Sequence, residues 1–126
     1  MPLHWTIDSQ RRTVEIVADG NVSLADAMAF FDAIEGAKAL PYTKLLDCRR
    51  GLSSMTAEEL SSIAVRIRGH HDQSVMGAFA VVATDMQAQF LARVLGAAAV
   101  ADRPIKMFTD IAPARRWRDA QSRRAP

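Results

Sequence analysis

A short and almost continuously apolar run, Gly77-Ala-Phe-Ala-Val-Val-Ala83, constrains the fold of this chain more than any other feature. A half-buried strand alternates apolar and polar residues, whereas a strand covered on both faces does not, and the second pattern is typical of parallel sheets. Parallel strands need crossover connections, which are usually helices. The run therefore predicts an α/β domain in which this segment is the central strand.

The N-terminal part of the chain predicts a β-hairpin. Apolar and polar residues alternate over residues 3–7 and again over residues 14–18, which is the period of a half-buried strand. The polar stretch 8–12 between them is short enough for a hairpin turn. These two strands are therefore expected to pair antiparallel at one edge of the sheet.

A helix and a third strand follow the hairpin. Ser23 is placed as the N-cap of a helix that runs to about Glu35, with Gly36 as its C-cap. The strand is expected at residues 44–48, and a loop at residues 49–55 follows it.

The second helix begins with a clear signal. Thr56 and Glu59 stand at capping-box spacing, so each can satisfy an unpaired backbone N–H at the helix start. This helix is expected to stop near Gly69. His70-His71-Asp72 would then form a polar turn.

The C-terminal third of the chain completes the pattern. Asp85 can cap a third helix, and residues 104–108 predict the last strand. Asp110 starts a terminal helix, in whose first turn Pro113 costs little. The residues of the third helix that are expected to face inward are Phe90, Leu91, Val94 and Leu95.

The resulting order is β-β-α-β-α-β-α-β-α, in a mixed and mostly parallel sheet with an antiparallel N-terminal edge strand. A length of 126 residues suits one hydrophobic core. Residues 1–121 are therefore expected to form a single domain. Residues 122–126 are polar and basic, and a frayed C-terminal tail is expected there.

The composition predicts a cytoplasmic globular domain. The one cysteine cannot form an intramolecular disulfide, and the N-terminus lacks the basic and apolar regions of a secretion signal. The most apolar stretch, residues 90–101, contains Arg93 and is shorter than the roughly 20 residues that a membrane span needs. No transmembrane segment is expected.

Positive charge is concentrated near the C-terminus. Residues 1–100 hold 9 Lys and Arg against 11 Asp and Glu, whereas residues 101–126 hold 7 against 3. Such a region attracts anionic partners, although a solvated helix face explains it as well, and no nucleic-acid partner is predicted. Trp117 is expected to pack inward and to leave an exposed basic patch of Arg115, Arg116 and Arg118.

With this element order, the chain resembles the SpoIIAA-like group of small bacterial STAS-type proteins. The resemblance is carried by Lys44-Leu-Leu-Asp47, by the helix entry Ser53-Ser-Met-Thr-Ala-Glu-Glu-Leu60 and by Phe108-Thr-Asp-Ile-Ala-Pro-Ala-Arg-Arg-Trp117. It covers nearly the whole chain and implies a single-domain SpoIIAA-like fold.

The resemblance also points to the loop before the second helix. In anti-sigma-factor antagonists of this fold, that loop carries an Asp-Ser-Ser-Gly motif whose serine is phosphorylated by a partner kinase. Here Ser53 and Ser54 lack both the aspartate before them and the glycine after them. The resemblance therefore implies an architecture more securely than a phosphorylation switch.

Ser53, Ser54 and Thr56 form a candidate regulatory or partner-binding loop. A phosphate at this helix start would meet unpaired N–H groups and the positive end of the helix dipole. The same residue types are those that any helix start needs, and we favour the simple capping role for Thr56.

Asp47, Cys48, Arg49 and Arg50 form a candidate strand-end pocket, because open α/β sheets bind ligands at the carboxyl ends of their strands. The two arginines could lower the pKa of the Cys48 thiol and make it a nucleophile. A lone cysteine beside an apolar strand is more often inert packing, and we favour that interpretation.

No catalytic, metal or cofactor site is predicted. The adjacent histidines His70 and His71 seldom point to one metal ion, and His4 is the only other histidine. The chain has neither a Gly-rich phosphate loop nor a Gly-x-Ser-x-Gly elbow.

Methionine and phenylalanine side chains suggest either ordinary core packing, which we favour, or a small apolar ligand between helices and sheet. Phe30 and Phe31 are adjacent on a helix and about 100° apart, so one of them is expected at an interface or a pocket rim. The residues concerned are Met28, Phe30, Phe31, Met55, Met76, Met86, Phe90 and Met107.

Three functions stay open at this point. We favour a non-enzymatic protein-binding or regulatory module that docks a partner, or a second copy of itself, through the helix entered at Thr56 and the loop before it. The second is a carrier of a small apolar, lipid-like ligand. The third is an enzyme that uses Asp47, Cys48 and the arginines that follow.

Overall fold

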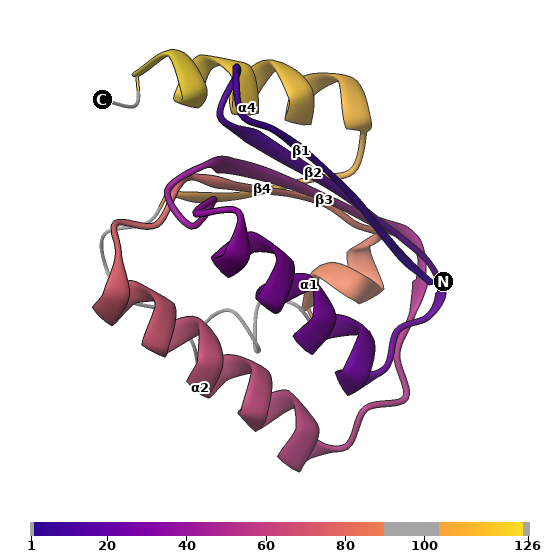
Figure 1. Cartoon of the computed structure of the whole chain (residues 1–126). Helices are drawn as coiled ribbons and strands as arrows, with labels where there is room; N and C mark the ends of the chain where they lie inside the picture. The colour runs from indigo at the N-terminus through magenta and orange to yellow at the C-terminus, as the bar shows by residue number, and fades with distance from the viewer. Residues whose placement is uncertain (1, 90–103, 125–126) are drawn as a thin grey trace.

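The computed structural model describes residues 2–89 and 104–124. They form a five-stranded sheet in the order β1-β2-β3-β4-β5, with helices on both faces (Figure 1). β1 (Leu3–Asp8) pairs antiparallel with β2 (Thr13–Asn21), as predicted. The remaining strands are parallel: β3 (Thr43–Leu52), β4 (Phe79–Val82) and β5 (Ile105–Phe108).

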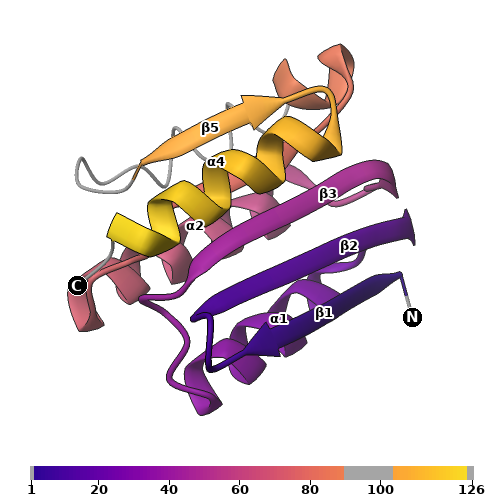
Figure 2. The same cartoon turned by 90° about the horizontal axis from the view of Figure 1, so that it is seen from above.

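The direction of the crossovers decides which helix covers which face. α1 (Leu24–Gly36) joins β2 to β3, and α2 (Ala57–Gln73) joins β3 to β4. Both right-handed crossovers step the same way along the sheet, so both helices lie on one face (Figure 1). α4 (Ile111–Arg124) follows β5 and, among the described helices, is the one on the opposite face (Figure 2).

The larger part of the core lies between the sheet and the helices α1 and α2. Phe30 and Phe31 are both buried there, which corrects the expectation that one of them lies at a rim. Phe30 meets the ring of Trp5 at 5.5 Å between centroids, and Phe31 meets the imidazole of His70 at 5.4 Å. A broad apolar stripe on α1 therefore accommodates both rings.

A smaller core lies under α4. Leu45, Ala80 and Val82 point to this face, where Ala114 of α4 is fully buried. Trp117 is only partly buried and packs against Phe108, with ring centroids 6.1 Å apart. β4 is thus covered on both faces, as its apolar run predicts, although β3 and not β4 is the middle strand of the sheet.

Both expected N-caps of the first two helices are present, and each is part of a capping box, of which only the one at Thr56 was predicted. Ser23 and Asp26 bond reciprocally at the start of α1, and Thr56 and Glu59 do so at the start of α2. At the next helical residues, 85–89, the box is formed by Thr84 and Gln87, so Asp85 is the first helical residue and not the cap.

The predicted end of the first helix is off by one residue. Gly36 is still helical, Ala37 is the C-cap, and the left-handed conformation falls on Lys38 with a φ of 56°. The inward-facing residues expected for the third helix, 90–95, lie outside the described part of the chain.

Several other elements continue beyond their predicted ends, whereas β4 and β5 are shorter than the predicted residues 77–83 and 104–108. β3 continues through Arg49, Arg50 and Gly51, which were expected in a loop, with a register shift where Cys48 and Arg49 face Ala18. α2 continues to Gln73, so His70-His71-Asp72 is helical and not a turn. α4 extends beyond residue 121 to Arg124.

Candidate functional site

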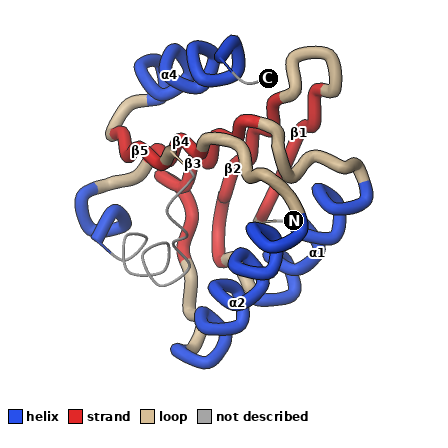
Figure 3. The backbone as a smooth tube through the Cα atoms, turned by 90° about the vertical axis from the view of Figure 1, so that its left-hand side faces the viewer, coloured by secondary structure: helices blue, strands red, loops and turns tan. Residues whose placement is uncertain are grey.

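The carboxyl ends of the four parallel strands share one edge of the sheet, called here the carboxyl edge (Figure 3). Open α/β sheets commonly bind ligands at this edge. The loop residues Ser53, Ser54 and Thr56 and the strand residues 47–50 lie at this edge or beside it, but they do not all face the same side of the sheet. The arginines of α4 lie elsewhere, because Arg115 and Arg118 contact Glu15 near the opposite end of β2.

The loop at residues 53–55 is held in place by the end of β2. Asn21 Oδ1 accepts hydrogen bonds from the backbone N–H and the hydroxyl of Ser54, at 3.2 and 3.3 Å. The Ser53 hydroxyl donates to the Val22 carbonyl at 3.4 Å. Ser53 and Ser54 are both exposed, so a fixed loop presents them to solvent.

Thr56 is occupied by its structural role. Its Oγ1 accepts from the Glu59 N–H at 3.2 Å, and Glu59 Oε1 accepts from the Thr56 N–H at 3.0 Å. Glu58 and Glu59 add negative charge to the first turn of α2. An added phosphate here would therefore compete with carboxylates already placed at the positive end of the helix dipole.

Asp47 and Arg49 form an ion pair on the strand that leads to this loop. The Arg49 guanidinium donates to both carboxylate oxygens of Asp47, at 3.0 and 2.8 Å. This contact lowers the pKa of the Asp47 carboxyl below its ordinary value, against the opposing effect of partial burial. Asp47 is therefore a fixed anion that orients Arg49 and no proton donor near neutral pH.

Cys48 points to the opposite face of the sheet and is buried. Its thiol donates to the Val82 carbonyl at 3.2 Å. Burial raises the pKa of the Cys48 thiol to about 11, and the negative charge of Asp47 contributes a smaller part of this increase. The thiol stays protonated at physiological pH, which favours the inert interpretation over a nucleophile.

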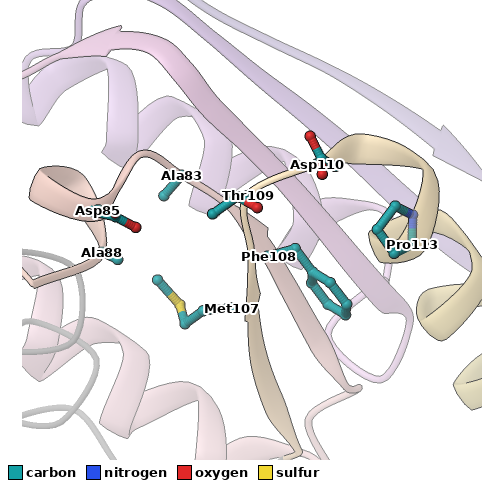
Figure 4. Close-up of a pocket in the computed structure, with 8 residues that line it drawn as sticks. All are labelled: Ala83, Asp85, Ala88, Met107, Phe108, Thr109, Asp110 and Pro113. Carbon is teal, nitrogen blue, oxygen red and sulfur yellow. The ribbon is translucent and has the colours of Figure 1, made fainter.

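The pocket at the carboxyl edge lies away from Asp47, Cys48, Arg49 and Arg50. It has a volume of about 360 Å³ and sits between the end of β5 and the starts of two helices (Figure 4). Its polar lining groups are Asp85, Thr109 and Asp110, and its apolar lining consists of Ala83, Ala88, Met107, Phe108 and Pro113. This pocket was not predictable from sequence patterns, because its lining comes from two segments that are separated along the chain.

Two exposed apolar side chains flank the same edge. Leu52, at the end of β3, is 69% exposed, and Met86, at the start of the next helix, is 86% exposed. The two segments are joined by a hydrogen bond of 3.0 Å from Gln87 Nε2 to the Gly51 carbonyl. Leu52 and Met86 therefore add exposed apolar area to two joined segments at this edge, and contiguous exposed apolar area is what marks a surface for contact with another molecule.

The predicted basic patch is divided by ion pairs. Arg115 and Arg116 are exposed, but the side chain of Arg118 is only 11% exposed, which corrects its expected exposure. Arg118 and Arg115 both reach Glu15 of β2, at 3.3 and 3.2 Å, and Arg118 also pairs with Asp119 at 3.0 Å. These arginines thus tie α4 to the sheet.

A polar network between α1 and α2 was missed from the sequence. Arg66 bridges Asp32 and Glu35 at 2.6 and 2.7 Å, and Glu35 Oε1 lies 2.8 Å from Nε2 of His70, whose side chain is 1% exposed. Burial lowers the pKa of His70 although Glu35 opposes this effect. The position of His70 at helical spacing after Ile63 and Ile67 was the available signal.

The described residues include neither a metal-binding cluster nor a membrane-spanning helix. Among residues 2–89 and 104–124, His, Cys, Asp and Glu side chains do not come together in any group of three that could hold a metal ion. In the same residues, every helix is too short or too polar to cross a membrane.

Comparison with known proteins yields a structural relative. No family model and no curated protein matches the sequence. The fold matches the crystal structure of an uncharacterised protein with a SpoIIAA-like fold, from the DUF3478 family of Shewanella loihica PV-4. The TM-score is 0.66 at 15% sequence identity, over 91% of this chain and 92% of that chain. The resemblance inferred from the sequence is therefore confirmed for the fold.

Proposed function

We propose that this SpoIIAA-like domain is a non-enzymatic module that docks a protein partner at the carboxyl edge. The docking surface consists of Leu52, the loop residues Ser53 and Ser54, the start of α2 at Thr56, and Met86. The observation that carries the proposal is the pair of exposed side chains Leu52 and Met86 beside a fixed loop.

The surface has the chemistry of a protein interface. Leucine and methionine supply apolar area, and methionine adapts its shape to a partner. The two serines supply hydroxyl groups on a backbone already fixed by Asn21 and Val22, so little conformational entropy is lost on binding.

The docking surface is tested by charge substitution. Leu52→Glu and Met86→Glu place charges where an apolar contact would form, and neither side chain supports the core. The matched control is Val75→Glu, since Val75 is 81% exposed and follows the C-terminal end of α2. Affinity for the partner should fall at least about tenfold in the first two variants and stay unchanged in the third. Equal binding by all three would overturn the proposal.

A small apolar ligand is the second candidate, and the 360 Å³ pocket favours it. Its apolar floor between Met107 and Ala88 and its two carboxylates suit an amphiphile without negative charge. Native mass spectrometry of the purified chain tests this. A mass equal to that of the bare chain, together with a melting temperature that a panel of neutral and cationic amphiphiles leaves unchanged, would exclude such a ligand.

An enzyme that uses Cys48 is the least supported function. The thiol is buried, bonded to Val82 and protonated, and Asp47 faces the other side of the sheet in a pair with Arg49. These groups therefore do not act on one substrate from a common side.

A further inference from the structure

The outer edge of β1 carries a row of backbone groups that point away from the sheet. The Pro2 carbonyl accepts from the Asp19 N–H at 2.7 Å, so the even-numbered residues of this segment bond to β2. Hydrogen-bonding direction alternates along an antiparallel strand. The N–H and C=O groups of Leu3, Trp5 and Ile7 therefore point outward, and no described segment lies beyond them (Figure 2).

The same three residues point their side chains to one face of the sheet. Leu3 is buried in the main core, and Trp5 and Ile7 are partly buried against it. The even-numbered residues His4 and Thr6 are exposed on the other face. Leu3, Trp5 and Ile7 thus combine outward-pointing backbone groups with side chains that face the core.

Natural proteins usually protect such an edge, and the other edge of this sheet shows how. β5 is only four residues long, follows Pro104, and carries Lys106 in its middle. Short length, proline and lysine all discourage the addition of another strand. β1 is six residues long and carries a charge only at its end, on Asp8, which accepts the N–H groups of the turn.

We propose that the partner of the β1 edge is a second copy of this chain, added antiparallel about a two-fold axis beside Trp5. Trp5 then faces the Trp5 of the second copy, and Leu3 faces its Ile7. In this register every outward N–H meets an outward C=O, and all apolar side chains stay on one face. A slip of one residue loses both matches, and a slip of two residues keeps them but pairs only two of the three outward residues of each copy.

The aromatic side chains reinforce this pairing. Trp5 rests edge-on against Phe30 of α1 at the border of the core, where it is only partly buried. The two-fold axis brings two such pairs together and covers their remaining exposed area. Tryptophan is enriched at the centres of interfaces for this reason. This surface is distinct from the docking surface at Leu52 and Met86 and does not depend on that proposal.

Charge substitutions at His4 and Thr6 test the register directly. In the proposed dimer, His4 of each copy lies opposite Thr6 of the other, whereas neither side chain belongs to the core. His4→Lys/Thr6→Lys then places like charges opposite each other, and His4→Lys/Thr6→Glu places opposite charges there. By sedimentation equilibrium, the first variant should dimerise at least about tenfold more weakly than the second. Equal dissociation constants for the two variants would overturn the register.

Amide hydrogen exchange provides the second measurement. The N–H groups of His4 and Thr6 bond to β2 and should be protected at all concentrations. Those of Leu3, Trp5 and Ile7 should become protected only as the concentration rises and the dimer forms. Rapid exchange of the Trp5 N–H in a sample shown to be dimeric would overturn the proposal. So would a chain that stays monomeric at several hundred micromolar, which is about a hundredfold above the dissociation constant of a weak but specific dimer.

A control variant separates this interface from the docking surface. Ser61→Lys/Val65→Lys adds the same charge to exposed positions of α2. It should leave dimerisation unchanged. If it dissociates the dimer instead, the copies meet through α2 and the β1 proposal is wrong, whereas the proposal for Leu52 and Met86 is judged by its own variants.

Discussion

The Nε2 atom of His70 lies 2.8 Å from Oε1 of Glu35, and this contact joins the last turn of α2 to the last turn of α1. His70 Nδ1 is buried without a hydrogen-bond partner in the described structure. A second proton on the ring would therefore be placed where nothing accepts it. The neutral imidazole with its proton on Nε2 fits this site.

This contact gives the fold a defined response to acid. Burial lowers the pKa of His70 below its ordinary value of 6.5, so the unfolded chain takes up a proton more readily than the native one. Stability that depends on the neutral ring should thus fall as the pH drops below about 6.5. Urea unfolding at a series of pH values should show this slope for the wild type and a shallower one for His70→Gln. Identical slopes would contradict the assignment.

Glu35 acts in a different and more acidic range. The hydrogen bond from Arg66, and to a smaller extent the hydrogen bond with His70, lower the pKa of the Glu35 carboxyl below its ordinary value of 4.5. Its stabilising effect is therefore present above about pH 4.5 and is lost below it. Below about pH 4.5, Glu35→Gln should reduce the slope of the unfolding free energy with pH. The reduction should be larger than for the solvent-exposed control Glu58→Gln. Equal flattening by both variants would show that Glu35 has no special role.

Two glycines provide a matched test of packing. A Cβ on Gly77 would lie 2.0 Å from the Tyr42 carbonyl oxygen, whereas one on Gly69 in α2 would meet nothing within 4 Å. Gly77→Ala should lower the free energy of unfolding by at least about 2 kcal/mol. Gly69→Ala should raise it by about 0.5–1 kcal/mol because alanine favours the helix. Similar midpoints in urea for the two variants would contradict the close approach of Gly77 to the Tyr42 carbonyl.

Trp117 tests how α4 is attached to the sheet. It is partly buried against Phe108, so Trp117→Ala should lower the free energy of unfolding by roughly 2 kcal/mol, less than for a fully buried tryptophan. The exposed neighbour Arg116 serves as the control, and Arg116→Glu should change the free energy by no more than about 0.5 kcal/mol. Thermal unfolding of both variants is the measurement, and a reversed order of effects would mean that α4 packs through its other face.

Sequence patterns predicted the features that depend on neighbouring residues. The alternation of Trp5 and Ile7 with polar residues predicted the hairpin, and the spacing of Thr56 and Glu59 predicted the start of α2. Both signals come from residues that are only a few positions apart in the sequence. They are strong because the residues that create the structure lie together in the sequence.

Features that depend on distant segments were not predictable in this way. Gly69 was expected to end α2, but packing of Ile67 and His70 against α1 carries the helix to Gln73. The fully buried Lys44 donates to the carbonyls of Leu40 and Tyr42, which no periodicity shows. Cys48 and Asp47 were expected to share a pocket, but adjacent strand residues point to opposite faces.

The central claim is that the carboxyl edge docks a protein partner, and site-specific photocrosslinking in cells tests it most directly. A photoreactive residue at Leu52 should give one discrete adduct, and the same residue at Val75 should give none. Excess wild-type chain should compete the adduct away, whereas excess Leu52→Glu chain should not. Adducts of equal yield from positions 52 and 75, or an adduct that both competitors remove equally, would contradict the claim.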